Sequence, residues 1–151
     1  MNIVRKHQLW RIITEIDAVS VDEEIHYLGT AGAFSEETEE NDQCLPVALF
    51  HDLVEDKYIS MDELAKKARL NQEQIAALDA ITRRPGERYF DYIARLKTNE
   101  IARKVKLADL SNNMKRCVFD LPNRWGLIRR YAKAYGILTD QWKEYEGEPK
   151  K

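Results

Sequence analysis

The chain of 151 residues is 44% hydrophobic and 33% charged, a composition typical of one folded domain rather than of a disordered or fibrous protein. Its longest apolar run, LPVALF at 45–50, is far shorter than the roughly 20 residues of a membrane span, and the start MNIVRKHQLWRII lacks the features of a signal peptide. Cys44 and Cys117 stand in no paired motif. We therefore expect reduced thiols in a cytoplasmic protein with no membrane partner.

The net charge of −2 hides a division along the chain. Residues 1–82 carry 17 acidic and 7 basic side chains, whereas residues 83–133 carry 14 basic and 5 acidic ones. The simplest explanation is a dipolar surface, or two patches that attract each other within the fold or between the copies of a homo-oligomer. The functional alternative is a basic wall that faces an anionic ligand, opposite an acidic wall that holds a cation. Non-specific contact with nucleic acid is compatible with this charge, but we expect no specific nucleic-acid partner.

Apolar residues recur at helical spacing along most of the chain, and no segment shows the alternation of a strand. The acidic stretch 35–42 is predicted as a polar link, and residues 147–151 as a frayed end. We therefore expect an all-α protein with a single domain over residues 1–151. The predicted helices lie within residues 3–19, 21–34, 43–54, 60–68, 71–82, 87–96, 99–119 and 123–142.

Several residues mark where individual helices begin. Ser60 with Glu63, and Asn71 with Gln74, are capping-box patterns, which stand at the start of a helix. Pro46 is acceptable in a first turn, where no backbone hydrogen bond is lost. The helix that contains it is therefore expected to begin only shortly before this proline.

The segment LFHDLVED, residues 49–56, places four ionisable side chains in an apolar context. On a helix, Glu55 follows His51 by one turn and Asp56 follows Asp52 by one turn. An imidazole and carboxylates are a suitable ligand set for a divalent cation, and acids one turn further on can activate a bound water. A surface turn with a stray histidine would also give this pattern. The apolar flanks favour the metal site, because a buried carboxylate without a partner costs several kcal/mol.

A second polar stripe lies in VKLADLSNNM, residues 105–114. Lys106, Asp109 and Asn113 share one helical face, beside an apolar stripe. Asp109 supplies a further carboxylate, Asn113 can donate to a phosphate or a water, and Lys106 can neutralise an anion. An ordinary Lys–Asp pair on a half-exposed helix would explain the same pattern.

LFHDLVED followed by VKLADLSNNM, with Asp109 57 positions after Asp52, resembles the HD-domain metal-dependent phosphohydrolases. Within them it is most similar to the small stand-alone enzymes that remove the 3′ pyrophosphate from the alarmone ppGpp. Those enzymes carry LLHDxVEDT and, some sixty residues later, VKLADxxxN. The segment from ITRRPGERYF onward also resembles them, so that the similarity extends from Cys44 to Ala134.

The resemblance implies a single HD-type helical bundle with one divalent ion, usually Mn²⁺. It makes His51, Asp52 and Asp109 metal ligands, and Glu55 and Asp56 the acidic pair that positions and activates the attacking water. It also implies that a residue in the place of Asn113 contacts the substrate. Lys106 and Arg103, with Arg83 and Arg84, are further candidates to bind a diphosphate, since guanidinium groups suit phosphate oxygens.

Residues 1–40 depart from the family pattern. Members carry HxGQxRKxGxPYxxHP, with a further histidine ligand and nucleotide-binding basic residues, and this segment is absent here. His26 precedes His51 by 25 residues, an interval that resembles the one between the two family histidines. We expect His26 to complete the ligand set, with His7, or neither, as the alternatives. A lysine, Lys57, also stands where a threonine is usual.

The leading functional hypothesis is a metal-dependent phosphohydrolase that removes pyrophosphate from a guanosine alarmone or a related nucleotide. The alternatives are an HD-type nucleotide phosphomonoesterase, which the altered first residues favour, and a non-catalytic HD module that binds a nucleotide or a protein. The aromatic residues of 89–92 and 125–135 could stack a base, but at helical spacing they are more often part of a core.

Overall fold

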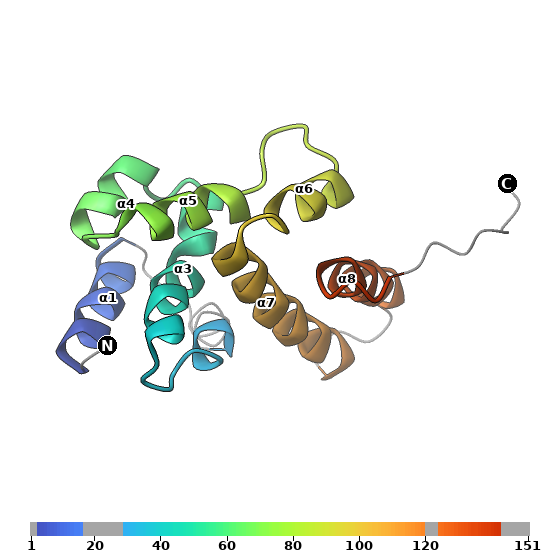
Figure 1. Ribbon diagram of the computed structural model, residues 1–151, viewed down its shortest axis with the longest axis horizontal. Helices are drawn as coiled ribbons and strands as arrows, with labels where there is room; N and C mark the ends of the chain where they lie inside the picture. Colours follow the sequence, from blue (N-terminus) through green and yellow to red (C-terminus); the bar gives the residue numbers. More distant parts are fainter. Residues whose placement is uncertain (1–2, 17–28, 120–123, 143–151) are drawn as a thin grey trace, which may run out of the picture.

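The computed structural model describes residues 3–16, 29–119 and 124–142 (Figure 1). Within these ranges the regular elements are helices and no strand is present, so the predicted all-α class is confirmed. Most of the predicted segment 21–34 and the expected frayed end, 147–151, lie outside the described residues. The helices are α1 (Ile3–Ile16), α3 (Glu39–Glu55), α4 (Met61–Lys67), α5 (Gln72–Ile81), α6 (Tyr89–Leu96), α7 (Glu100–Phe119) and α8 (Trp125–Leu138).

Helix α3 begins earlier than the sequence predicts, because half of the expected polar link is its first turn. The hydroxyl of Thr38 accepts a hydrogen bond from the backbone N–H of Asn41 at 3.1 Å and caps the helix. Acidic residues in the first turn add a favourable interaction with the helix dipole. Pro46 is consequently inside the helix. The carbonyl of Asp42, which Pro46 cannot bond, accepts instead from the Gln74 side chain of α5 at 3.4 Å.

The two predicted capping boxes differ in how completely they form. At the start of α5, Gln74 donates its backbone N–H to the Asn71 side chain, and the Gln74 side chain accepts from the Asn71 backbone. At the start of α4, Ser60 accepts from the backbone N–H of Glu63, but its own hydroxyl donates to the Glu63 carboxylate. Ser60 and Asn71 therefore each mark a helix start, as predicted, but only the capping box at the start of α5 is reciprocal.

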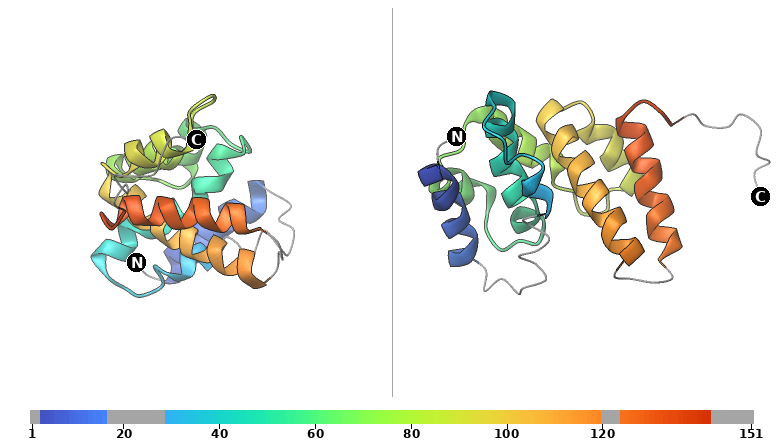
Figure 2. Two further views of the ribbon diagram at one scale, coloured as in Figure 1. Left: turned by 90° about the vertical axis from the view of Figure 1, so that its right-hand side faces the viewer. Right: turned by 90° about the horizontal axis from the view of Figure 1, so that it is seen from below.

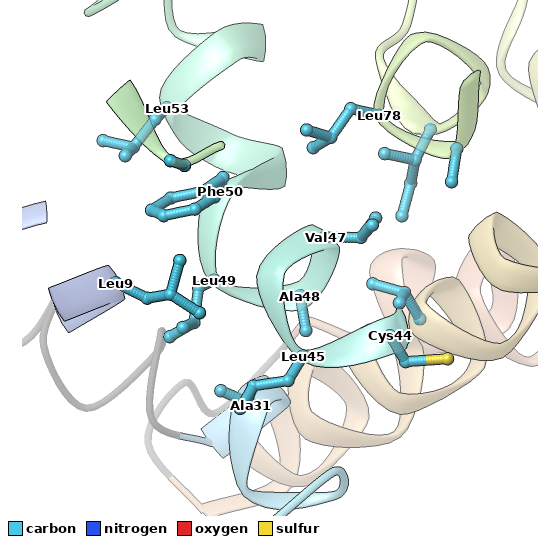
Figure 3. Packing of buried hydrophobic residues seen from close by; sticks show 14 of the residues in the cluster. Leu9, Ala31, Cys44, Leu45, Val47, Ala48, Leu49, Phe50, Leu53 and Leu78 are labelled. Carbon is cyan, nitrogen blue, oxygen red and sulfur yellow. The ribbon is translucent and has the colours of Figure 1, made fainter. Parts of the chain in front are cut away.

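Two hydrophobic clusters form the core. The larger one joins α1, α3, α4 and α5, and Figure 3 shows Val47, Phe50 and Leu53 of α3 with Leu78 of α5 among its members. The smaller one joins α6, α7 and α8 and includes Tyr92, Ile93, Leu96, Leu110, Ala134 and Leu138. Helix α7 belongs to both, because it packs on α3, α5 and α8, with Ala102 and Val105 in the larger cluster and Leu110 in the smaller one.

This arrangement places α7 at the centre of the molecule, with α3 on one side and α8 on the other (Figure 1). The views of Figure 2 show α7 and α8 side by side, with α6 against α8. The end of α3 therefore meets the middle of α7 beside the smaller cluster. Within the described part of the chain, no helix combines the length and apolarity that crossing a membrane requires.

Arg95 of α6 fastens the turn between α5 and α6. Its guanidinium donates to both carboxylate oxygens of Glu87, at 2.7 and 2.9 Å, and to the carbonyls of Ala80 and Thr82, at 3.0 and 3.1 Å. The hydrogen bond from Arg95 lowers the pKa of Glu87 to about 2. The turn carries Arg83 and leads into Tyr89, so that its position matters for the site described below.

We expect Arg95→Met to lower the free energy of unfolding by about 2–4 kcal/mol, because it removes several charge-assisted bonds and leaves partly buried acceptors unbonded. The matched control is Arg88→Met, which removes an exposed pair with Asp91 and should leave urea denaturation unchanged. The charged form of Glu87 is the stabilised one, so the Arg95 effect is complete above its ordinary pKa of 4.5 and fades as the pH falls toward 2. Equal losses in both variants would contradict this role.

Candidate functional site

His51 is held in a fixed orientation at the end of α3. Its side chain is buried, with the residue 2% exposed, and its Nδ1 lies 2.8 Å from the carbonyl oxygen of Ala48. Because a carbonyl only accepts, Nδ1 carries a hydrogen and donates it. The other ring nitrogen, Nε2, faces two carboxylates, 3.2 Å from Asp52 Oδ1 and 3.8 Å from Asp109 Oδ1.

Asp109 of α7 is 3% exposed and is surrounded by polar partners. Lys106 Nζ lies 2.7 Å from its Oδ2, and Asn113 donates to its Oδ1 at 2.9 Å. Although burial raises the pKa of Asp109, Lys106 and His51 hold it well below its ordinary value. The predicted stripe of Lys106, Asp109 and Asn113 is therefore one connected group around a charged carboxylate.

His51 lies beside Asp52 and Asp109, as the sequence predicts. This centre of three residues favours a positive charge. Burial lowers the pKa of His51, but the two carboxylates raise it by more, to about 9. A divalent ion binds to the unprotonated ring and competes with that proton. One imidazole nitrogen beside two carboxylates is a set of donor types that suits Mn²⁺.

His51 Nε2 lies within hydrogen-bonding distance of Asp52 and somewhat farther from Asp109. Among the residues that the structure describes, no group of three or more His, Cys, Asp or Glu side chains is already arranged around a metal position. His26, expected as the further ligand, lies outside the described residues. His7 is exposed on α1 and lines a different, apolar cavity with Trp10 and Leu49, away from His51.

A cavity of about 240 Å³ opens beside this centre, between α3, α6, α7 and α8. Its lining brings acidic side chains of residues 1–82 together with basic and aromatic ones of residues 83–133, and Asp109 lies beside Lys106. The lining residues are Asp52, Glu55, Asp56, Arg83, Tyr89, Tyr92, Lys106, Asp109, Asn113, Arg130 and Tyr131.

Glu55 and Asp56, the predicted acidic pair, both line the cavity. Glu55 is exposed as a residue, yet the protein around its carboxyl raises the pKa by burial, and Lys106 opposes that rise. A carboxylate with a raised pKa is a better proton acceptor near neutral pH. Its place one turn beyond His51 puts it near the centre, where it can act on a water.

Of the predicted substrate-binding residues, Lys106 and Asn113 line the cavity and Arg103 does not. Arg103 is half-buried, and it adds to the lowering of the pKa values of Glu100 and Asp140, which hydrogen bonds from Lys104 and Lys97 mainly cause. Arg84 lies near Asp79, with 3.9 Å between the nitrogen and oxygen.

Arg130 lines the cavity and was not predicted. A signal for it exists in the sequence, because Arg130 precedes the buried Ala134 and Leu138 by one and two helical turns and so shares their inward face. The aromatic residues belong mainly to the core, as expected. Tyr92 is 2% exposed and donates its hydroxyl to the Ile81 carbonyl, whereas Trp125 is 68% exposed.

Neither a protein-family model nor a curated protein matches the chain.

Proposed function

We propose that the protein is a metal-dependent phosphohydrolase of the HD type, which removes pyrophosphate from a guanosine alarmone such as ppGpp or from a related nucleotide in the cytoplasm. The proposal rests on one observation. His51 and Asp52 of the first motif lie close to Asp109 of the second, which is distant in sequence, beside a cavity that Glu55 and Asp56 also line. Separate structural roles for the two motifs would not require them to meet.

His51, Asp52 and Asp109 would hold the ion. When bound, a divalent ion, Mn²⁺ by the resemblance, promotes the ionisation of water and offsets negative charge on phosphate oxygens. Glu55 takes a proton from the attacking water as the water oxygen bonds to phosphorus. The bond from phosphorus to the nucleoside oxygen breaks, and that oxygen takes up a proton from solvent and leaves as a hydroxyl. Lys106 and Asn113 fix the Asp109 carboxylate and present further hydrogen-bond donors to the cavity.

Two observations favour other functions. The family segment that binds the nucleotide is absent from residues 1–40, which suits a phosphomonoesterase of simpler nucleotides. The ammonium of Lys106, 2.7 Å from Asp109 Oδ2, neutralises that carboxylate without a metal, which suits a non-catalytic module that binds a nucleotide or a protein.

A hydrolysis screen with added Mn²⁺ separates these functions. We expect guanosine tetraphosphate to release intact pyrophosphate, with activity lost after chelation and restored by Mn²⁺. Release of phosphate from nucleoside monophosphates alone would assign the phosphomonoesterase function. No turnover of either substrate, or of a generic phosphodiester, would leave the non-catalytic module.

A further inference from the structure

Tyr89, at the start of α6, carries two guanidinium groups against its ring. The Cζ atom of Arg130 lies 4.7 Å from the ring centroid, and that of Arg83 lies 5.9 Å from it. Arg83 comes from the turn after α5 and Arg130 from α8, so that two separate elements bring their charges to one tyrosine. All three residues line the cavity that the carboxylates face. Cation–π attraction holds both guanidinium groups against the Tyr89 ring.

These two charges have neutral partners within the described ranges. Arg83 donates from Nε and Nη2 to the backbone carbonyl of Glu87, at 3.0 and 2.6 Å. Arg130 contacts the rings of Tyr89 and Tyr131, with its Cζ 5.5 Å from the latter centroid. The neighbouring arginines of α6 are different, since Arg88 and Arg95 each bond a carboxylate. Among the described residues, therefore, neither Arg83 nor Arg130 forms an ion pair with a carboxylate.

The hydroxyl of Tyr89 is a third polar group beside the guanidinium groups of Arg83 and Arg130. It is buried and has no hydrogen-bond partner among the described residues, a state that costs about 1–3 kcal/mol. Burial raises its pKa, and the charges of Lys106, Arg130 and Asp109, all of them cavity residues, also act on it. Tyr89 lines the cavity together with these residues, and a phosphate bound there would give its hydroxyl the partner that the described residues do not.

We infer that Arg83, Tyr89 and Arg130 form an anion subsite that receives a phosphate group of the substrate, in the cavity that Asp109 also lines. Guanidinium forks match phosphate oxygens, and a phenol adds one more donor. Because two guanidinium groups already contact the Tyr89 ring, we assign this tyrosine to phosphate binding rather than to base stacking. The inference rests on the proposed function and narrows its substrate class to compounds that carry two phosphate groups, one hydrolysed beside the carboxylates and one held here.

The test is a calorimetric titration of the metal-free full chain with inorganic pyrophosphate. Arg83→Gln and Arg130→Gln should each weaken binding about tenfold, because each removes a charge-assisted bond. Tyr89→Phe should weaken it about fivefold, the effect of one neutral hydrogen bond. The matched control is Arg129→Gln, the same charge change at the neighbouring exposed residue of α8, outside the cavity. It should change the affinity less than about twofold.

The inference is overturned if the wild-type chain shows no saturable pyrophosphate binding, or if Arg129→Gln and Arg130→Gln weaken it equally. Its failure is distinct from failure of the proposed function. A chain that binds pyrophosphate with these variant effects but hydrolyses no nucleotide refutes only the proposed function. A chain that hydrolyses guanosine tetraphosphate with the same KM in wild type, Arg83→Gln and Arg130→Gln refutes only the subsite.

Discussion

Asp109→Asn is expected to weaken Mn²⁺ binding at least about a hundredfold, more than the loss of a group that merely orients a ligand. The substitution keeps the size of the side chain, but its amide offers one acceptor oxygen where the carboxylate accepts from both Asn113 and Lys106, and it removes the charge that faces His51 Nε2. The measurement is metal content and affinity after Mn²⁺ loading. The control is Asp91→Asn, an exposed carboxylate of α6 that should leave metal binding unchanged.

Asp109 also supports the fold, and this second role must be separated from the first. In Asp109→Asn, the Lys106 ammonium, whose side chain is 13% exposed, loses its charged partner, and the metal-free protein should lose about 3–5 kcal/mol of stability. Adding Lys106→Met removes the unpaired charge and should recover much of that stability without restoring the metal. An Asp109→Asn protein that holds Mn²⁺ as tightly as wild type would remove Asp109 from the ligand set.

The helices and the contents of the two motifs could be predicted from the sequence because both depend on local spacing. His51 with Glu55, and Asp109 with Asn113, are one turn apart on any helix, and apolar flanks imply burial. That reasoning places the two groups correctly on α3 and α7, whose packing then joins them.

The beginning of α3 and the cluster of Arg83 and Arg130 around Tyr89 depend on contacts between residues distant in sequence. Pro46 is tolerated inside α3 because Gln74 of α5 bonds the carbonyl that the proline leaves, and no local pattern around the proline reveals this. Arg83 and Arg130 meet on Tyr89 only because α8 packs against α6. Arg103, which the sequence favours as a substrate ligand, lies nearer to Glu100 and Asp140, since the sequence does not show where along α7 the cavity ends.

Glu55→Gln is expected to lower kcat for alarmone hydrolysis by about 10²–10⁴-fold, the contribution of a general base, with Mn²⁺ still bound. Glutamine keeps the size of the side chain and its place in the cavity, but its amide cannot take a proton from water. Glu55 is suited to this task because it lines the cavity and because burial raises its pKa.

The measurement is steady-state kinetics together with metal content for Glu55→Gln, with Glu63→Gln as the control. Glu63 is exposed on α4, outside the cavity, so the control should keep wild-type kcat. The ratio of kcat to KM should fall in parallel with kcat, because the carboxylate acts on the transition state and not on substrate binding. If Glu55→Gln instead loses its metal, Glu55 is a ligand, and the proton acceptor must be sought at Asp56, the other acid of the pair. If kcat and metal content both stay at the wild-type level, Glu55 has no part in the reaction.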